Sequence, residues 1–388
     1  MNRRNFLLTA AAMPLVAFVP YRLAFAAARW DRVLVMVELQ GGNDGLNTVI
    51  PYSDPEYAAL RPTIKVPRER VLQLDEKMGL AREFQPLMPL WQQKQMGIVM
   101  GVGYPNPNLS HFRGIDIWHT GTDSEESATV GWIAEVFKQG EAPPATYAAD
   151  GIVVGRGNVG PLRAPDRRIL VLENGGAAAM NEAKRMAGVN DMGGGNAALA
   201  HLLTTQQQFK MSSAAVLAKN VDKVDLGATF PAGDFGGQMK MAAQLLVGGV
   251  QVPVIKTTLG GFDTHANQLG DQPPLHAQLA GGLAAFAESM KKHNLWDRVL
   301  VMTYSEFGRR AGENGSGGTD HGTAAPHFIL GGKVKGGLYG RQPSLKDLDA
   351  RNLVHTTHFR SMYATAAQEW WGISTPFIKE KPLGIIAA

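Results

Sequence analysis

The sequence contains no cysteine. This absence excludes a disulfide scaffold, a metal site built from thiolates and an enzyme with a cysteine nucleophile. Stability must therefore come from the burial of apolar side chains. A chain of 388 residues, of which 45% are hydrophobic, is long enough to form a core of that kind.

The chain also lacks a basic patch interleaved with aromatic residues, which is the usual feature of a nucleic-acid-binding surface. The formal net charge is +4, and three of the contributing arginines lie within residues 1–28, which contain no acidic residue. Removal of that segment would lower the formal net charge to +1. We therefore expect no nucleic-acid partner.

The apolar run near the N-terminus is too short to span a membrane and is interrupted by Pro14. It follows the paired arginines of Asn2-Arg3-Arg4-Asn5-Phe6 and precedes the small residues Ala24-Phe25-Ala26 or Ala26-Ala27-Ala28. This order is typical of a twin-arginine export signal with its cleavage site. We expect residues 1–28 to be a signal peptide read by the twin-arginine translocation machinery. The mature chain would then be periplasmic or secreted, without a transmembrane segment.

In the rest of the chain, apolar runs bounded by Gly or Pro alternate with amphipathic stretches. This pattern predicts an α/β fold with a mixed, mostly parallel central sheet and helices on both faces. Strands are expected at Val33–Leu39, Met96–Val102, Ile152–Val154, Ile169–Leu172, Val252–Leu259, Val299–Tyr304 and His327–Leu330. Helices are expected at Glu83–Lys94, His111–His119, Val130–Gln139, Ala197–Asn220, Gln238–Gly248, Leu275–His293 and Thr357–Trp371.

We expect one domain over residues 29–388. A single weak seam lies at residues 174–196, where pairs and triplets of glycine bracket a polar, Ala-rich piece. The seam is either a loop or the edge of a helical subdomain over residues 197–249.

The most informative segment follows the strand Val299–Tyr304. That strand ends in Ser305-Glu306-Phe307-Gly308-Arg309, and a Gly-rich loop then leads to Asp320-His321. Ligands of α/β proteins bind at the carboxyl ends of parallel strands, and carboxylate with imidazole suits a divalent metal. Because Asp320 and His321 are adjacent, we expect one to bind metal and the other to support it. His327 is either a further ligand or a structural residue.

Two other strand ends carry similar groups. Asp44 follows the first strand in a Gly-Gly-Asn-Asp-Gly turn, where it is either a metal carboxylate or a residue chosen for the turn alone. Asp263 and His265 follow a Gly-Gly pair after the strand Val252–Leu259, and their spacing places both on one face of an extended segment. Convergence of several such ends predicts a metal site.

The strand Met96–Val102 leads through a Pro- and Asn-containing loop to Ser110-His111-Phe112-Arg113 and a helical pattern. Ser110 fits a helix N-cap, and a helix N-terminus also suits a phosphate or sulfate near a nucleophilic hydroxyl. Arg113 lies one turn into the helix and is placed to bind an oxyanion. Ser127 and Thr129 are weaker rivals for the hydroxyl.

The ordered motifs Gly-Gly-Asn-Asp-Gly, Leu-Ser-His-Phe-Arg, Gly-Gly-Phe-Asp-Thr-His, Tyr-Ser-Glu-Phe-Gly-Arg and Thr-Asp-His-Gly together cover nearly the whole mature chain. In this set the chain resembles an exported bacterial family, domain of unknown function 1501. That family looks like a branch of the alkaline phosphatase and sulfatase superfamily. The resemblance implies an alkaline-phosphatase-like fold, one or two divalent metals at the carboxyl ends of the strands, and phosphoryl or sulfuryl transfer.

Carried over residue by residue, the resemblance makes Asp44 the metal carboxylate of the first strand and Ser110 the nucleophile. Asp263 and His265 would match the Asp and His of the second metal. The superfamily's late strand usually ends in an Asp-His pair, whereas this strand ends in Glu306-Phe307 and the pair follows later. This departure leaves open the number of metals and whether Glu306 is a ligand.

The leading hypothesis is an exported, metal-dependent hydrolase of phosphate or sulfate esters, acting on a small-molecule or polysaccharide ester. One or two divalent ions (Zn, Mg, Ca or Mn) would be held by residues drawn from Asp44, Asp263, His265, Glu306, Asp320 and His321. Ser110 would attack, and Arg113 would steady the oxyanion. The alternative is a non-catalytic envelope or surface-polysaccharide assembly protein that keeps the scaffold and a structural metal.

Overall fold

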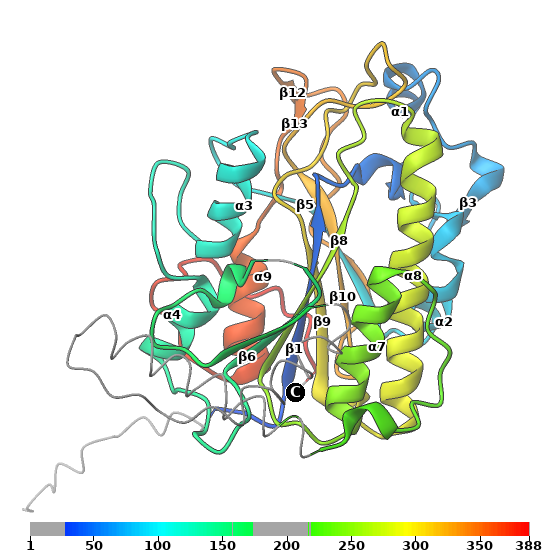
Figure 1. The fold of residues 1–388 in the computed structure, drawn as a ribbon. Helices are drawn as coiled ribbons and strands as arrows, with labels where there is room; N and C mark the ends of the chain where they lie inside the picture. Colours follow the sequence, from blue (N-terminus) through cyan, green and yellow to red (C-terminus); the bar gives the residue numbers. More distant parts are fainter. Residues whose placement is uncertain (1–27, 157, 174–215, 217–218, 388) are drawn as a thin grey trace, which may run out of the picture.

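The computed structural model describes residues 28–156, 158–173, 216, 219–387. The expected signal peptide, apart from Ala28, therefore lies outside the described residues. So do the expected seam at 174–196, nearly all of the expected helix 197–220 and much of the expected subdomain 197–249. The remaining residues form one α/β unit, shown in Figure 1.

A nine-stranded sheet forms the centre of this unit, in the order β11-β5-β10-β9-β1-β8-β6-β7, with β14 also paired to β5. The strands are β1 (Val33–Gln40), β5 (Met96–Gly103), β6 (Gly151–Val154), β7 (Ile169–Leu172), β8 (Val254–Gly260), β9 (Val299–Tyr304), β10 (Ala325–Leu330), β11 (Gly337–Tyr339) and β14 (Thr357–His358). Of these, β10 alone runs antiparallel to its neighbours β5 and β9. The predicted mixed, mostly parallel sheet is confirmed.

Helices cover both faces of the sheet, as predicted (Figure 1). One face carries η3 (Arg82–Leu87), α2 (Met88–Gln92), α7 (Asp234–Val247) and α8 (Gln268–Lys292), and the other carries α3 (His111–Thr120), α4 (Trp132–Gln139), α9 (Arg360–Ala364) and the π-helical η8 (Thr365–Trp371). The alternation along β1 explains the two cores: Val33, Val35 and Val37 enter one cluster, and Leu34 and Met36 enter the other.

Short elements complete the unit, mostly at the ends of the sheet. They are η1 (Gly45–Asn47), β2 (Val49–Ile50), α1 (Pro55–Leu60), η2 (Arg68–Arg70), β3 (Val71–Gln73), β4 (Gly79–Ala81), η4 (Gly160–Leu162), η6 (Val221–Lys223), η7 (Trp296–Arg298), β12 (Leu348–Asp349) and β13 (Asn352–Leu353). In Figure 1 the carboxyl end of β1 is at the top, beside α1, the start of α8 and the β12–β13 hairpin.

The seven predicted strands are all present, whereas four predicted helices differ. Helix α7 begins at Asp234 rather than at Gln238. The expected helix Glu83–Lys94 is a 3-10 turn followed by a short α-helix, with Pro86 and Pro89 within them. The last helix begins at Arg360 rather than Thr357, because Thr357 and His358 pair with β5. Helix α8 begins at Gln268, ahead of Pro273 and Pro274, rather than at Leu275 as expected.

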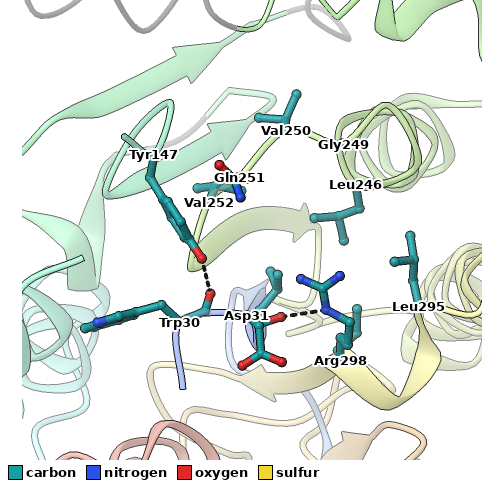
Figure 2. Close-up of a pocket in the computed structure, with 12 residues that line it drawn as sticks. Trp30, Asp31, Tyr147, Leu246, Gly249, Val250, Gln251, Val252, Leu295 and Arg298 are labelled. Carbon is teal, nitrogen blue, oxygen red and sulfur yellow. Dashed lines mark hydrogen bonds between the residues drawn. The ribbon is translucent and has the colours of Figure 1, made fainter. Parts of the chain in front are cut away.

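The amino edge of the sheet contains a cavity of about 200 Å³, shown in Figure 2. Tyr147 donates a hydrogen bond to the Trp30 carbonyl across it, and Arg298 donates to the Asp31 carbonyl. Leu246 and Leu295 line the wall. The predicted site residues lie at the opposite, carboxyl edge. No helix within the described parts of the chain combines the length and hydropathy needed to cross a membrane.

Candidate metal centre

Three imidazoles and one carboxylate meet at the carboxyl edge. His111 begins α3 after β5, Asp263 and His265 lie in the loop after β8, and His321 lies in the loop between β9 and β10. Asp263 Oδ1 is 3.1 Å from Nε2 of both His265 and His321, and Asp263 Oδ2 is 3.3 Å from Nε2 of His111. The Nε2 atoms of His265 and His321 are 2.9 Å apart. The ligand atoms of His111, Asp263 and His321 therefore lie within 4.8 Å of one another, and His265 lies against Asp263 and His321 at the side of this group.

Glycines permit this close approach of loops. Gly41, with φ of +117°, lies so near the loop after β8 that a Cβ would come within 2.4 Å of the Asp263 backbone nitrogen. A Cβ on Gly318 would come within 2.4 Å of the backbone carbon of His265. Real Cβ atoms are not found at such distances, so a side chain at either position would push the ligand-bearing segments apart.

The second nitrogen of His111 and of His321 each has a hydrogen-bond acceptor, and that of His265 faces a carboxylate at a longer distance. Nδ1 of His111 is 2.8 Å from Glu306 Oε1, and Nδ1 of His321 is 2.8 Å from the Leu109 carbonyl. Nδ1 of His265 is 3.6 Å from Asp320 Oδ1. A carbonyl can only accept, so Nδ1 of His321 carries the proton, and Nε2 of the neutral ring presents a lone pair. Such support of Nδ1 is typical of metal-bound histidine.

The charge states of the cluster suit a cation. Partial burial acts to raise the pKa of Asp263, but the hydrogen bond and charge of Arg309, with His321 and His111, lower it to about 2. Burial lowers the pKa of His321 more than its contacts with Leu109 and Asp263 raise it. An ionised carboxylate then faces the lone pair of a neutral imidazole. These groups repel each other unless a proton or a metal ion lies between them.

Arg309 holds Asp263 in place. Its side chain is fully buried and donates to Asp263 Oδ1 and to the carbonyls of Gly42, Phe262 and Thr319. These partners belong to three separate loops, so one guanidinium joins the loops that follow β1, β8 and β9. Asp263 Oδ2 remains on the side of His111.

A family model described as Protein of unknown function (DUF1501) matches residues 79–369. This match spans well over half of the sequence. The chain belongs to this family. The resemblance seen in the motifs is thereby confirmed. No curated protein matches the chain.

Solved structures with similarity to this DUF1501 chain include three bacterial proteins. The lipoteichoic acid synthase LtaP from Listeria monocytogenes is 8% identical with a TM-score of 0.43, over 91% of this chain and 74% of that chain. The C-terminal periplasmic domain of EcEptC from Escherichia coli is 10% identical with a TM-score of 0.42, over 90% and 84%. Alkaline phosphatase from the Antarctic bacterium TAB5 is 14% identical with a TM-score of 0.33, over 79% and 94%.

The structure gives Asp44 a different role from the expected one. Its buried carboxylate forms an ion pair with Arg61, at 2.5 Å between Arg61 Nη1 and Asp44 Oδ2. Gln268 donates to the same carboxylate, and so does the backbone nitrogen of Leu46. These donors occupy both oxygens, which leaves no side of Asp44 open to a metal. In this DUF1501 protein Asp44 therefore forms a buried ion pair and does not belong to the group of His111, Asp263 and His321.

Glu306 and Asp320 lie behind the ligands. Glu306 is buried, and its Oε1 accepts both from His111 Nδ1 and from the Gly41 backbone nitrogen, each at 2.8 Å. Asp320 lies between His265 and Arg310, with Arg310 Nη1 at 3.3 Å from Oδ2. Both carboxylates therefore orient imidazoles. Of the adjacent pair, His321 faces Asp263 and Asp320 faces His265, and the expectation that one binds metal while the other supports it stays a prediction.

Ser110 occupies the N-cap position of α3, but its hydroxyl makes no cap hydrogen bond. The neighbours of Ser110 in the chain both take part in the centre: the Leu109 carbonyl accepts from His321, and His111 faces Asp263. Ser110 is exposed and lies at the rim of the cluster.

Arg113 points into another network. It pairs with Asp116 at 2.7 Å and donates to the carbonyls of Asp123, Ser124 and Glu126. The guanidinium therefore fastens the loop after α3 to the helix. The side chain of Arg113 is thus already paired within the fold, and its expected oxyanion role stays a prediction.

Sequence reasoning assigned no role to His111. It stood beside Ser110 in the Leu-Ser-His-Phe-Arg motif, and its position just after a strand's carboxyl end was the available signal. His327, in contrast, is buried in β10 and packs against the Trp118 ring. Of the two alternatives, a further ligand or a structural residue, the structure supports the structural residue.

Proposed function

We propose that this protein is an exported, metal-dependent hydrolase of phosphate or sulfate esters. The observation that carries the proposal is the close group of His111, Asp263 and His321, in which a hydrogen bond to Nδ1 orients each of the two imidazoles. Periplasmic or secreted location after twin-arginine export belongs to the same proposal and depends on the N-terminal motif.

The ligand set favours zinc among the divalent metals considered. His111, Asp263 and His321 would hold the ion with His265 beside them, since a catalytic zinc takes three imidazole or carboxylate ligands and keeps a fourth position open. Mg²⁺ and Ca²⁺ prefer oxygen ligands, and a site with two imidazoles suits them poorly. A divalent ion bound here would supply the positive charge that stabilises a transferring phosphoryl or sulfuryl group.

We propose Ser110 as the nucleophile. Its oxygen would bond to phosphorus or sulfur while the ester oxygen departs with a proton as an alcohol. Water would then cleave the serine ester, which releases phosphate or sulfate and restores the hydroxyl. Ser110 precedes α3, a ten-residue helix, and the N-terminus of a helix favours an anion.

A non-catalytic envelope or surface-polysaccharide assembly protein is the second candidate. One observation favours it: Arg113, the cation expected to bind the oxyanion, is already bound to Asp116 and the loop after α3. In that case the metal would hold three loops together and turnover would be absent.

The two candidates differ in metal content and in turnover. We expect the purified folded protein to contain one zinc per chain and to hydrolyse an aryl phosphate or an aryl sulfate. His321→Ala should lose the metal, because it removes one ligand, whereas Ser110→Ala should retain the metal and lose turnover by orders of magnitude.

His293→Ala, in the turn after α8 at the other end of the helix, is the matched control and should keep both properties. Metal analysis and a broad ester panel provide the readouts. Bound metal without turnover of either ester class would favour the envelope protein. A folded wild type that binds no divalent metal would overturn the proposed centre.

A further inference from the structure

Large apolar side chains are exposed at three places within the described parts of the chain. Phe112 is 89% exposed, Leu269 is 50% exposed and Val354 is 49% exposed. A single exposed apolar residue is common and needs no explanation. The distribution of these three is what matters.

Each of the three follows a residue that holds the carboxyl edge together. Phe112 follows His111, and Leu269 follows Gln268, whose side chain bonds to Asp44 and Thr319. Val354 follows Leu353, whose carbonyl accepts from Thr323, two residues beyond His321. Figure 1 shows the start of α8 and the β12–β13 hairpin at the same end of the sheet as the tip of β1.

The two edges of the sheet therefore differ. At the amino edge, apolar residues such as Leu246 and Val250 line the cavity shown in Figure 2. None of them is among the strongly exposed apolar residues. At the carboxyl edge, Phe112 exposes most of its ring one residue from a proposed metal ligand. Since water around such a ring is unfavourable, the ring gains free energy when an apolar group covers it.

We propose that Phe112, with Leu269 and Val354 as outer members of an apolar rim, binds the aliphatic or aromatic portion of the ester substrate. This inference rests on the proposed hydrolase function and specifies its substrate class: an amphiphilic ester with its charged group at the metal centre and its apolar alcohol portion on the rim. Phe112 is then a specificity-determining residue, and the released alcohol is apolar.

Turnover of a matched pair of substrates tests the inference. Phenyl phosphate offers an apolar alcohol portion, and glycerol phosphate offers a polar one. Phe112→Ser should lower the ratio of kcat/KM for phenyl phosphate to that for glycerol phosphate by about 5-fold, mainly through KM, since a partly covered ring loses contact with the substrate. Phe112→Trp should restore the ratio. Leu295→Ala, at the amino edge, should leave it at the wild-type value.

Binding tests the rim independently of turnover. Octyl phosphonate and methyl phosphonate cannot be hydrolysed and share one head group. Zinc-loaded wild type should bind octyl phosphonate about 10-fold more tightly, with a more negative heat-capacity change, and Phe112→Ser should remove most of that difference. If this holds while no ester is turned over, the hydrolase proposal fails and the apolar rim stands.

Two results would overturn the inference. One is an unchanged substrate ratio in Phe112→Ser together with equal affinity for the two phosphonates. The other combines two observations: equal affinity for the two phosphonates, and sedimentation with phosphatidylcholine vesicles by wild type but not by Phe112→Ser. In that case the rim would be a membrane contact.

Discussion

His327 is a single buried side chain with a consequence for acid stability. Burial lowers its pKa to about 3, and burial likewise lowers the pKa of His276 to about 3. An unfolded histidine has a pKa of about 6.5, so between roughly pH 3 and 6.5 the unfolded chain binds more protons than the folded one. The free energy of unfolding therefore rises with pH across this range and falls on acidification.

Replacing His327 by leucine tests this reading. The variant should lose one proton's contribution to the slope, about 1.4 kcal/mol per pH unit near pH 4–5.5, while the contribution of His276 remains. Urea unfolding at a series of pH values measures the slope. Between pH 7 and 8 the two proteins should show parallel behaviour, which is the internal control. An identical slope near pH 5 would mean that His327 is already protonated in the folded state.

At the scale of elements, the start of α8 is fixed by buried polar contacts. Gln268 and Gln272 both donate to Asp44, whose carboxylate pairs with Arg61 at the end of α1. These contacts explain why α8 begins ahead of Pro273 and Pro274: tertiary hydrogen bonds stabilise a first segment that local preference alone disfavours.

Arg61→Met should lower the free energy of unfolding by about 3–5 kcal/mol, because it leaves the Asp44 carboxylate buried without its cation. Asp44→Asn combined with Arg61→Met should recover part of the loss, since no unpaired charge then remains. Denaturant unfolding gives both values. Metal content distinguishes the two roles of Asp44. The folded Asp44→Asn variant should contain as much metal as wild type. If this variant loses the metal, Asp44 is a metal ligand.

At the scale of the whole molecule, the strands and the edge that bears the site followed from periodicity and from Gly-rich strand ends. The partners of Asp44 and Arg113 did not, because Arg61 and the loop after α3 are brought to them only by tertiary packing. His111 was missed for a related reason. Its position in the centre depends on Asp263 and Glu306, which are distant in sequence. Its neighbour Ser110 matched the known pattern of a helix N-cap and a nucleophilic hydroxyl.

Export is the remaining prediction for the whole chain. Arg3→Lys with Arg4→Lys keeps the charge of the N-terminus but removes the arginine pair, so uncleaved precursor should remain in the cytoplasm. Cell fractionation and the size of the protein give the readout. Arg22→Lys, in the same segment but outside the motif, should be exported normally. Normal processing of the double variant would show that another route carries the protein.

The wide sequence separation of the centre has a consequence for folding. His321 bonds to the Leu109 carbonyl 212 positions earlier in the chain, and His111 bonds to Glu306 at a separation of 195. A chain still on the ribosome has no centre until residues beyond His321 have emerged, and such long-range closure comes late. Metal capture would therefore coincide with completion of the fold and would take place in whichever compartment the chain folds.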